Sequence, residues 1–275
     1  MAIWRCLDTG SRPGAFNMAV DEALLKGAGS RPVLRFYGWD PPAISFGSAQ
    51  EPHREVDVDK CRAAGLDLVR RPTGGRAVLH WHELTYSVVC AEDDAALGGR
   101  VEDTYCRIGH CLVEGLRRLG VEAELERARS RPVAPRGPGA TAPCFSSTAR
   151  WEVKYRGRKL IGSAQRRARG SILQHGSLPL GDQHAKLTDF LPAAAQHLRS
   201  SMARCLEERS IHLMACVDRE LEWSELVDCM GAGFRRHLGV ELEPDELDGE
   251  EERRVADLVQ TRSAPRGEVE HLVGI

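Results

Sequence analysis

The sequence predicts an α+β protein: a largely antiparallel or mixed sheet flanked by helices, with a small helical part at its C-terminus. Segments that alternate apolar and polar residues, broken by Gly and Pro, dominate residues 1–178, whereas helical periodicity dominates from about Gly181 onward. Runs of strands followed by runs of helices are typical of the α+β class. We therefore expect a main domain over residues 1–200 and a helical extension over 201–275 that packs on it.

The expected strands are short and end at turn residues. They span residues 3–7, 33–37, 43–46, 66–71, 77–80, 84–90, 121–125, 151–155, 159–165 and 171–178. A turn at Arg156-Gly157 separates two of them, which predicts a hairpin over 151–165. Residues 127–143 hold four prolines and two glycines. This composition predicts a long exposed loop, and loops of that length are often functional or mobile.

The expected helices follow the periodicity of the apolar residues. They span residues 17–25, 57–64, 101–119, 221–238 and 250–262. The clearest is 101–119, because its apolar residues recur at the i, i+3, i+4, i+7 spacing of one helix face. Asp57 is placed to cap the second helix and Gly65 to end it. Gly239 is the expected stop of the fourth helix, and residues 243–245 are the expected connector to the fifth.

Composition narrows the class of protein. At 275 residues, with 42% apolar and 28% charged residues, the chain can bury a sizeable core as a globular protein. A net charge of -2 and a pI of about 6.6 give no global basic character, so we expect no nucleic acid partner. Nine cysteines without a CxxC pair favour a reducing compartment over a disulfide framework or a zinc ribbon. The chain shows neither the apolar core of a signal peptide nor the roughly 20 apolar residues of a membrane helix, so we expect a cytoplasmic protein.

The first motif, residues 70–80, reads R-R-P-T-G-G-R-A-V-L-H and breaks a strand. Gly74 and Gly75 would let backbone N–H groups approach an anion or a carbonyl. Arg70 and Arg71 point to opposite faces of a strand, so at most one faces a given site. The residues alone also allow a β-bulge or a hairpin turn. The segment is not a P-loop, because the Gly-Lys-Ser/Thr ending is missing.

The second motif places Cys144 after a Pro/Gly-rich loop and Lys159 fifteen residues later. A nearby cation lowers the pKa of a thiol, so this pair could form a nucleophile, although most cysteines are small buried hydrophobes. Lys159 is one of only five lysines among 38 basic residues, which favours a use as a compact point charge. His175 could pair with the cysteine or simply line a pocket.

Two further clusters carry charge or metal-binding groups. His80 and His82 share a strand face and could bind a metal, but no third ligand has a useful spacing, so we expect neither a metal nor a cofactor. Arg166, Arg167 and Arg169 could protect a strand edge or attract an acidic partner protein.

Together these motifs resemble the biotin/lipoate protein ligase superfamily, specifically the cysteine-dependent octanoyltransferases of lipoate assembly. The matching segments span nearly the whole chain: residues 17–25, 35–45, 70–80, 83–89, 143–145, 157–165 and 173–177. The resemblance implies the catalytic-domain fold of that superfamily, which is like that of class II synthetases. Two positions depart from the family's usual acidic residues: Trp81 follows His80, and Ser146 follows the Cys-Phe pair.

The resemblance also implies a role for each matching residue. Cys144 matches the nucleophile that takes the octanoyl group as a thioester, and Lys159 matches the lysine that lowers the cysteine pKa and holds the acyl carbonyl. The implied substrate-binding residues line the acyl tunnel and surround the reacting carbonyl: Arg70, Arg71, Thr73, Gly74, Gly75, His80, Gly162, Ser163, Gln165, His175 and Gly176.

The implied activity is transfer of an octanoyl group from acyl carrier protein to a lysine of a lipoyl domain. The implied acceptors are the glycine-cleavage H protein and E2 subunits, and the implied enzyme is a monomer that needs no ATP. Three alternatives stay open. They are an amidotransferase that moves octanoyl between lipoyl domains, an ATP-dependent lipoate–protein ligase that would not need Cys144, and a non-catalytic acyl- or adenylate-binding regulator.

Overall fold

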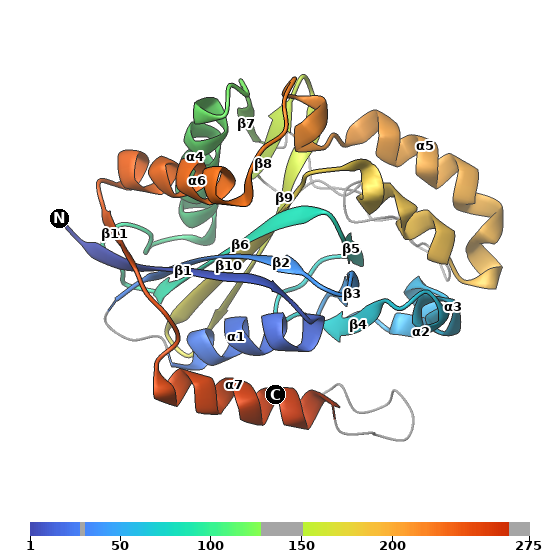
Figure 1. The fold of residues 1–275 in the computed structure, drawn as a ribbon, viewed down its shortest axis with the longest axis horizontal. Helices are drawn as coiled ribbons and strands as arrows, with labels where there is room; N and C mark the ends of the chain where they lie inside the picture. The colour runs from blue at the N-terminus through green and yellow to red at the C-terminus, as the bar shows by residue number, and fades with distance from the viewer. Residues whose placement is uncertain (28–30, 128–150, 264–275) are drawn as a thin grey trace.

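The computed structural model of the chain describes residues 1–27, 31–127 and 151–263. They form a large twisted sheet, covered by helices on both faces, and a small sheet beside it (Figure 1). Within these ranges no helix combines the length and the apolar character needed to cross a membrane.

The large sheet has eight strands in the order β11-β1-β2-β6-β10-β9-β8-β7. The bounds are β1 Ile3–Arg12, β2 Val33–Trp39, β6 Glu83–Ala91, β7 Glu124–Arg127, β8 Trp151–Tyr155, β9 Arg158–Ala168, β10 Ser171–Pro179 and β11 Glu241–Pro244. The β11-β1-β2 edge is parallel, and all other neighbouring strands are antiparallel. The mixed, mainly antiparallel sheet predicted from the sequence is therefore confirmed.

Two helical layers cover this sheet. Helices α1 (Gly14–Lys26) and α7 (Gly249–Ser263) pack on one face, and α4 (Val101–Arg118) and α6 (Trp223–Leu238) pack on the other (Figure 1). Adjacent strand residues point to opposite faces, so each central strand contributes to both cores. In β2, Val33 belongs to the core under α1, and Leu34 belongs to the core under α4 and α6. Burial on both faces explains why β2 has no exposed position.

The small sheet has the order β4-β3-β5, with β3 (Ala43–Phe46) parallel to β4 (Asp67–Arg70) and antiparallel to β5 (Val78–His80). It packs on helix α3 (Val58–Ala63) and the 3₁₀ helix η2 (Asp182–Phe190), and the short helix α2 (Pro52–Glu55) precedes α3. Because β4 and β5 lie on opposite sides of β3, the connection between them, residues 71–77, must cross one end of β3. This connection is the predicted Pro/Gly break.

The remaining helices follow β10 along the chain. They are η3 Ala193–Leu198, α5 Arg199–Arg209 and η4 Leu213–Ala215. Several expected features are confirmed: Asp57 accepts the N–H of Lys60 as the cap of α3, Gly239 ends α6 in the left-handed conformation, and residues 156–157 close the β8–β9 hairpin. The expected loop over residues 127–143 lies almost entirely outside the described residues.

The C-terminal part departs from the expectation in one respect. Residues 243–245 were expected to be a plain connector, but Glu241–Pro244 forms β11 and pairs in parallel with β1. Residues 201–263 therefore contribute a strand to the large sheet in addition to helices that pack on it. The division into domains at residue 200 stays a prediction.

Candidate active site

A cavity of about 340 Å³ lies where β9 and β10 of the large sheet face the small sheet and its 71–77 connection. Apolar side chains from five elements line it: Met18, Tyr37, Trp39, Val78, Tyr105 and Ala164. Polar side chains complete the lining: Ser45, Arg71, His80, Thr85, Lys159, Ser163, Gln165, His175 and Ser177. An apolar cavity of roughly 300–1,000 Å³ with a few convergent polar groups is the usual form of a small-molecule site.

Glycines form the parts of the wall where the backbone itself borders the cavity. They are Gly74, Gly75, Gly162 and Gly176. Gly75 has a φ of +102°, which side chains rarely adopt, and a Cβ there would lie 2.7 Å from Nη2 of Arg71. At Gly176 a Cβ would lie 2.6 Å from Cε1 of Tyr86. A side chain at either position would therefore displace the wall.

Lys159, near the start of β9, contributes a buried positive charge. Its Nζ lies 3.0 Å from Oε1 of Glu152 on β8, and the two side chains are 6% and 5% exposed. Lys154 lies 3.9 Å from the other oxygen of the same carboxylate. A charge removed from water needs a partner of this kind, so Glu152 stabilises an ammonium group at the cavity wall.

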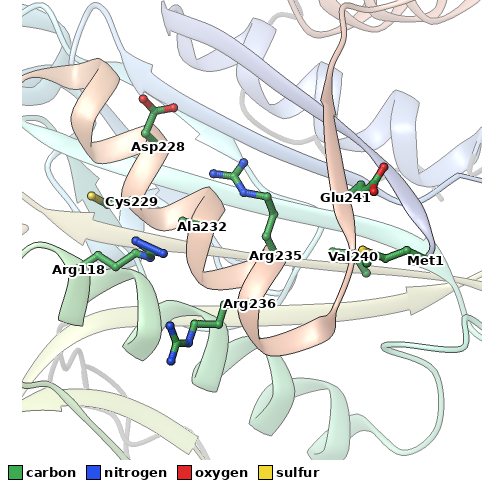
Figure 2. A pocket seen from close by; sticks show the side chains of 9 residues that line it. All are labelled: Met1, Arg118, Asp228, Cys229, Ala232, Arg235, Arg236, Val240 and Glu241. Atoms are coloured by element: carbon green, nitrogen blue, oxygen red, sulfur yellow. The ribbon is translucent and has the colours of Figure 1, made fainter.

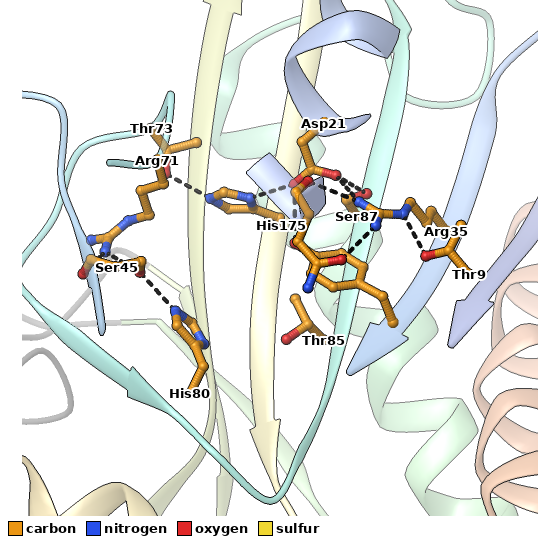
Figure 3. A network of polar contacts seen from close by, with 12 residues as sticks. Thr9, Asp21, Arg35, Ser45, Arg71, Thr73, His80, Thr85, Ser87 and His175 are labelled. Atoms are coloured by element: carbon orange, nitrogen blue, oxygen red, sulfur yellow. Dashed lines mark hydrogen bonds and ion pairs between the residues drawn. The ribbon is translucent and has the colours of Figure 1, made fainter. Parts of the chain in front are cut away.

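A buried polar chain runs from α1 through β10 to the 71–77 connection (Figure 3). Nδ1 of His175 lies 2.9 Å from Oδ2 of Asp21, and Nε2 lies 2.7 Å from Oγ1 of Thr73. Asp21 is fully buried and also pairs with the guanidinium of Arg35 at 2.9 Å. The hydroxyl of Ser87 donates to the same carboxylate. This network of hydrogen bonds therefore anchors a cavity-lining imidazole to a buried ion pair.

The protonation states of Asp21 and His175 in this network follow from burial and hydrogen bonding. Burial opposes ionisation of Asp21, but the hydrogen bond from His175 and the charge of Arg35 outweigh it, so the pKa of Asp21 is lowered. Burial lowers the pKa of His175 despite the neighbouring carboxylate. Since a carboxylate can only accept, Nδ1 of His175 carries the proton. The Nε2 atom of the neutral ring is then an acceptor, and the Thr73 hydroxyl donates to it.

A second chain of the same kind crosses the small sheet. Nδ1 of His80 lies 2.8 Å from Oε1 of Glu83, and Nε2 lies 2.7 Å from Oγ of Ser45. Arg71 donates to that same Ser45 hydroxyl at 2.9 Å. The His80 ring stacks on Trp39 with centroids 4.1 Å apart. These contacts fix the orientation of a second imidazole at the cavity.

The structure brings together ten of the residues that the sequence pointed to. The ten that line the cavity are Arg71, Gly74, Gly75, His80, Lys159, Gly162, Ser163, Gln165, His175 and Gly176. Thr73 lies behind the wall, bonded to His175. Arg70 does not line the cavity and donates to the carbonyls of Gly47, Ser48 and Gln50. Cys144 lies outside the described residues.

The arginine run on β9 has structural partners. Arg166 donates to the carbonyl of Pro72 at 2.8 Å, and Arg167 donates to the carbonyl of Gly99 and to Thr104. Both arginines lie in the ladder between β9 and β10. Arg166 therefore braces the 71–77 connection. The described pairing of β9 with β8 ends at Ile161, so a role of these two arginines at a strand edge or toward an acidic partner stays a prediction.

Several residues that build the site were not anticipated from the sequence. Asp21, Arg35, Glu83 and Glu152 supply the charges that hold the two histidines and Lys159. One signal was available: Arg35 stands inside the apolar run V-L-R-F-Y-G-W, where a charged residue requires a buried partner. The identity of that partner depends on the tertiary fold.

A second, wider hollow lies on the outer face of α6 and β11, beside the N-terminal residue (Figure 2). Its charged lining consists of Arg118, Asp228, Arg235, Arg236 and Glu241, all exposed side chains. None of the residues singled out in the sequence lines it. Buried charges of the kind found around the first cavity are absent from its lining.

Comparison with known proteins identifies the family. Residues 13–235 match the family model of the lipoyl protein ligase A/B catalytic domain. Octanoyltransferase LipM of Kyrpidia tusciae is 42% identical over 267 residues, which cover 94% of this chain and 96% of that protein. Octanoyltransferase LipM of Symbiobacterium thermophilum is 42% identical over 268 residues, with 94% and 95% covered.

A solved structure shows the same fold. The bipartite lipoate protein ligase of Thermoplasma acidophilum superposes with a TM-score of 0.77 at 23% identity, covering 94% of this chain and 93% of that one. The chain therefore belongs to the lipoyl protein ligase A/B catalytic-domain family and is an acyltransferase of its octanoyltransferase branch.

Proposed function

We propose that the protein transfers an octanoyl group from octanoyl-acyl carrier protein to a lysine of a lipoyl domain through a thioester on Cys144. Lipoyl domains of the glycine-cleavage H protein and of E2 subunits are the proposed acceptors. The observation that carries the proposal is the cavity, which joins an apolar wall to a buried lysine, Lys159. In this role Lys159 stabilises the thiolate of Cys144 and binds the acyl carbonyl, and it is not itself acylated.

The other cysteines support the choice of nucleophile. Among the residues that the structure describes, no cysteine lines the cavity. Burial raises the pKa of the thiols of Cys6 and Cys216 to about 11 and that of Cys90 to about 12. A thiol must be deprotonated to attack a thioester, so these groups are poor nucleophiles near neutral pH.

The proposed chemistry needs no ATP. The thiolate attacks the thioester of the donor, and exchange of one thioester for another is nearly isoenergetic. Backbone N–H groups along the glycine wall are suited to stabilise the oxyanion that forms. The acceptor lysine then attacks the acyl-cysteine to give an amide, which is more stable than a thioester and drives the transfer.

The apolar side chains of the cavity account for a medium-length acyl group. Met18, Tyr37, Trp39 and Val78 contribute to this wall. Each buried methylene is worth about 0.8 kcal/mol, so about six further methylenes would favour an octanoyl group over an acetyl group by roughly 5 kcal/mol as an upper bound. The same bookkeeping would favour decanoyl over octanoyl by about 1.6 kcal/mol, so selection against longer chains requires that the cavity close at its end.

Intact mass spectrometry tests the proposal directly. The protein is incubated with octanoyl-acyl carrier protein and no ATP, and digestion locates the added mass. We expect one octanoyl adduct, on Cys144, that disappears when an unmodified lipoyl domain is added. Cys144→Ala should form no adduct. Cys216→Ala is the matched control, because Cys216 directly follows η4 and does not line the cavity, and it should form the adduct at the wild-type rate.

Three outcomes would contradict the proposal in different ways. Activity that requires ATP and persists in Cys144→Ala would identify a lipoate–protein ligase. An adduct formed only from an octanoylated lipoyl domain would identify an amidotransferase. Absence of any adduct and of any transfer would leave only a binding protein.

A further inference from the structure

A line of hydrogen-bonded side chains crosses β9, β10 and β6 and ends at the cavity wall. Its members, in order, are Arg167, Gln165, Gln174, Tyr86 and Ser163. We propose that this relay fixes the Ser163 hydroxyl as a hydrogen-bond donor to the carbonyl oxygen of the bound acyl group. The inference rests on the proposed function, because it takes the ligand of the cavity to be an octanoyl group.

An arginine sets the direction of the relay at its far end. Nε of Arg167 lies 3.2 Å from Oε1 of Gln165, and a guanidinium can only donate. The other nitrogens of Arg167 donate to the carbonyl of Gly99 and to Thr104, which hold the side chain in place. Gln165 therefore turns its oxygen toward Arg167 and donates through Nε2 to Oε1 of Gln174, 2.9 Å away.

The same direction continues through Gln174 and Tyr86. Since Oε1 of Gln174 accepts from Gln165, its Nε2 donates to the Tyr86 hydroxyl at 3.2 Å. Tyr86 is 2% exposed, and burial raises its pKa to about 12, so the hydroxyl keeps its proton near neutral pH. Within the described chain, the remaining partner of this hydroxyl is Oγ of Ser163, at 2.8 Å. A buried proton without an acceptor is costly, so Tyr86 donates and Ser163 accepts.

Gly176 makes room for this last bond of the relay. It lies on β10 and is paired with Tyr86 on β6 and with Ser163 on β9. A Cβ at this position would lie 2.6 Å from Cε1 of Tyr86 and 2.8 Å from Oγ of Ser163. Ser163 and Gly176 both line the cavity, and Ser163 is partly exposed. A ligand in the cavity is therefore within reach of the Ser163 side chain.

The other serine and threonine hydroxyls of the cavity wall are already committed. Those of Thr85 and Ser177 donate to the carboxylate of Glu83. Oγ of Ser45 is bonded both to His80 and to a guanidinium. The hydroxyl at the end of the relay differs, because its one bonded neighbour among the described residues donates to it. Its own proton is therefore left for a ligand.

A carbonyl oxygen is suited to such a donor. It accepts through two lone pairs and has no proton of its own to give. Lys159 on the same strand adds an ammonium group, which also can only donate. A neutral hydrogen bond changes a binding constant by about 2–12-fold, which is enough to orient the acyl group without preventing its release.

A pair of ligands tests the inference. The first is a ketone analogue of octanoyl-pantetheine, in which a methylene group replaces the sulfur so that no acyl group can be transferred. In the second, a methylene group also replaces the carbonyl. The ratio of the dissociation constant of the second to that of the first, measured by calorimetry, isolates the carbonyl oxygen. Ser163→Ala should lower this ratio by about 2–12-fold.

Tyr86→Phe tests the relay itself. It should lower the ratio by less than Ser163→Ala does, because Ser163 keeps its hydroxyl and loses only its fixed direction. Adding Tyr86→Phe to Ser163→Ala should change the ratio no further, since the donor is already absent. The matched controls are Ser171→Ala on β10 and Tyr155→Phe on β8, which do not line the cavity and should keep the wild-type ratio.

Infrared spectra of the isotopically labelled ketone give a second measurement, which a purely structural role would not change. A hydrogen bond to a carbonyl lowers its stretching frequency, so the frequency of the bound ketone should be higher in Ser163→Ala than in wild type. Thermal unfolding and retained binding of the second ligand show that each variant is folded with its cavity formed.

The outcomes distinguish this inference from the proposed function. Octanoyl transfer by wild type, together with an unchanged ratio and an unchanged frequency in Ser163→Ala, would overturn the donor role of Ser163 and leave the proposed function intact. Failure of wild type to bind either ligand and to transfer octanoyl would overturn the proposed function, and the inference with it.

Discussion

Replacing Asp21 by Asn tests whether one carboxylate supports both the fold and the site. Asp21 and Arg35 are fully buried and 2.9 Å apart. Asn preserves the shape but leaves the guanidinium without its counter-charge, and breaking a buried ion pair in this way costs about 3–5 kcal/mol. Arg35 keeps its bonds to Thr9 and Asn17, so we expect a loss of about 3–4 kcal/mol. At about 2–4 °C per kcal/mol, the Tm should fall by roughly 6–16 °C.

Calorimetry at pH 7 measures this loss, and its pH dependence gives a second test. Because the pKa of Asp21 is lowered in the folded state, its stabilising effect is present above the unfolded value near 4 and is lost as pH falls from there toward the lowered value. The difference between wild type and Asp21→Asn should therefore shrink below about pH 4.

A matched control and a rescue make the test specific. Glu243→Gln removes a charge from the exposed Arg31–Glu243 pair and should change stability by no more than about 0.5 kcal/mol. Adding Arg35→Met to Asp21→Asn removes the unpaired charge and should recover part of the loss. A Tm for Asp21→Asn within 2 °C of wild type, measured to about that precision, would refute the reasoning. So would a double variant no more stable than the single one.

Two further predictions concern the cavity wall. Gly176→Ala places a methyl group 2.6 Å from Tyr86 and 2.7 Å from the carbonyl of Gly162. It should lower the free energy of unfolding, measured by chemical denaturation, by about 1–3 kcal/mol and should slow octanoyl transfer. A denaturation midpoint equal to that of wild type would show that the neighbouring atoms move aside without cost. Lys159→Met should abolish the octanoyl adduct and lower the free energy of unfolding by about 3 kcal/mol, the low end for a broken buried pair, because Lys154 stays 3.9 Å from Glu152. Lys159→Arg should retain most of that stability, and a Lys159→Met protein that still forms the adduct would exclude Lys159 from the chemistry.

Sequence patterns predicted those structural features that depend on residues a few positions apart. The heptad-like apolar spacing of 101–119, the cap at Asp57 and the turn at 156–157 all involve neighbours in sequence, and the structure has each of them. The glycine wall was also recognisable, because Gly-Gly after Pro marks a break whatever the fold. These are the features for which a short stretch of chain carries enough information.

Long-range pairings were not accessible in the same way. Asp21 and His175 are 154 positions apart, and the sequence around each residue gives no indication that the two side chains form a hydrogen bond. β11 was missed because Glu241–Pro244 is polar and ends in proline, and it forms a strand only because β1 offers it a free edge. The same holds for Arg166, whose carbonyl partner lies in the 71–77 connection.

The pairing of β1 with β11 has a consequence for synthesis of the chain. β1 precedes its outer partner, residues 241–244, by most of the described chain, and the ion-pair partners of Arg5 are Asp245 and Glu251. Since domains emerge from the ribosome over many seconds, β1 must exist for most of that time with an open edge. An unpaired edge invites pairing with other chains. Emergence of residues 241–244 from the ribosome is therefore the step after which the outer edge of β1 can be covered.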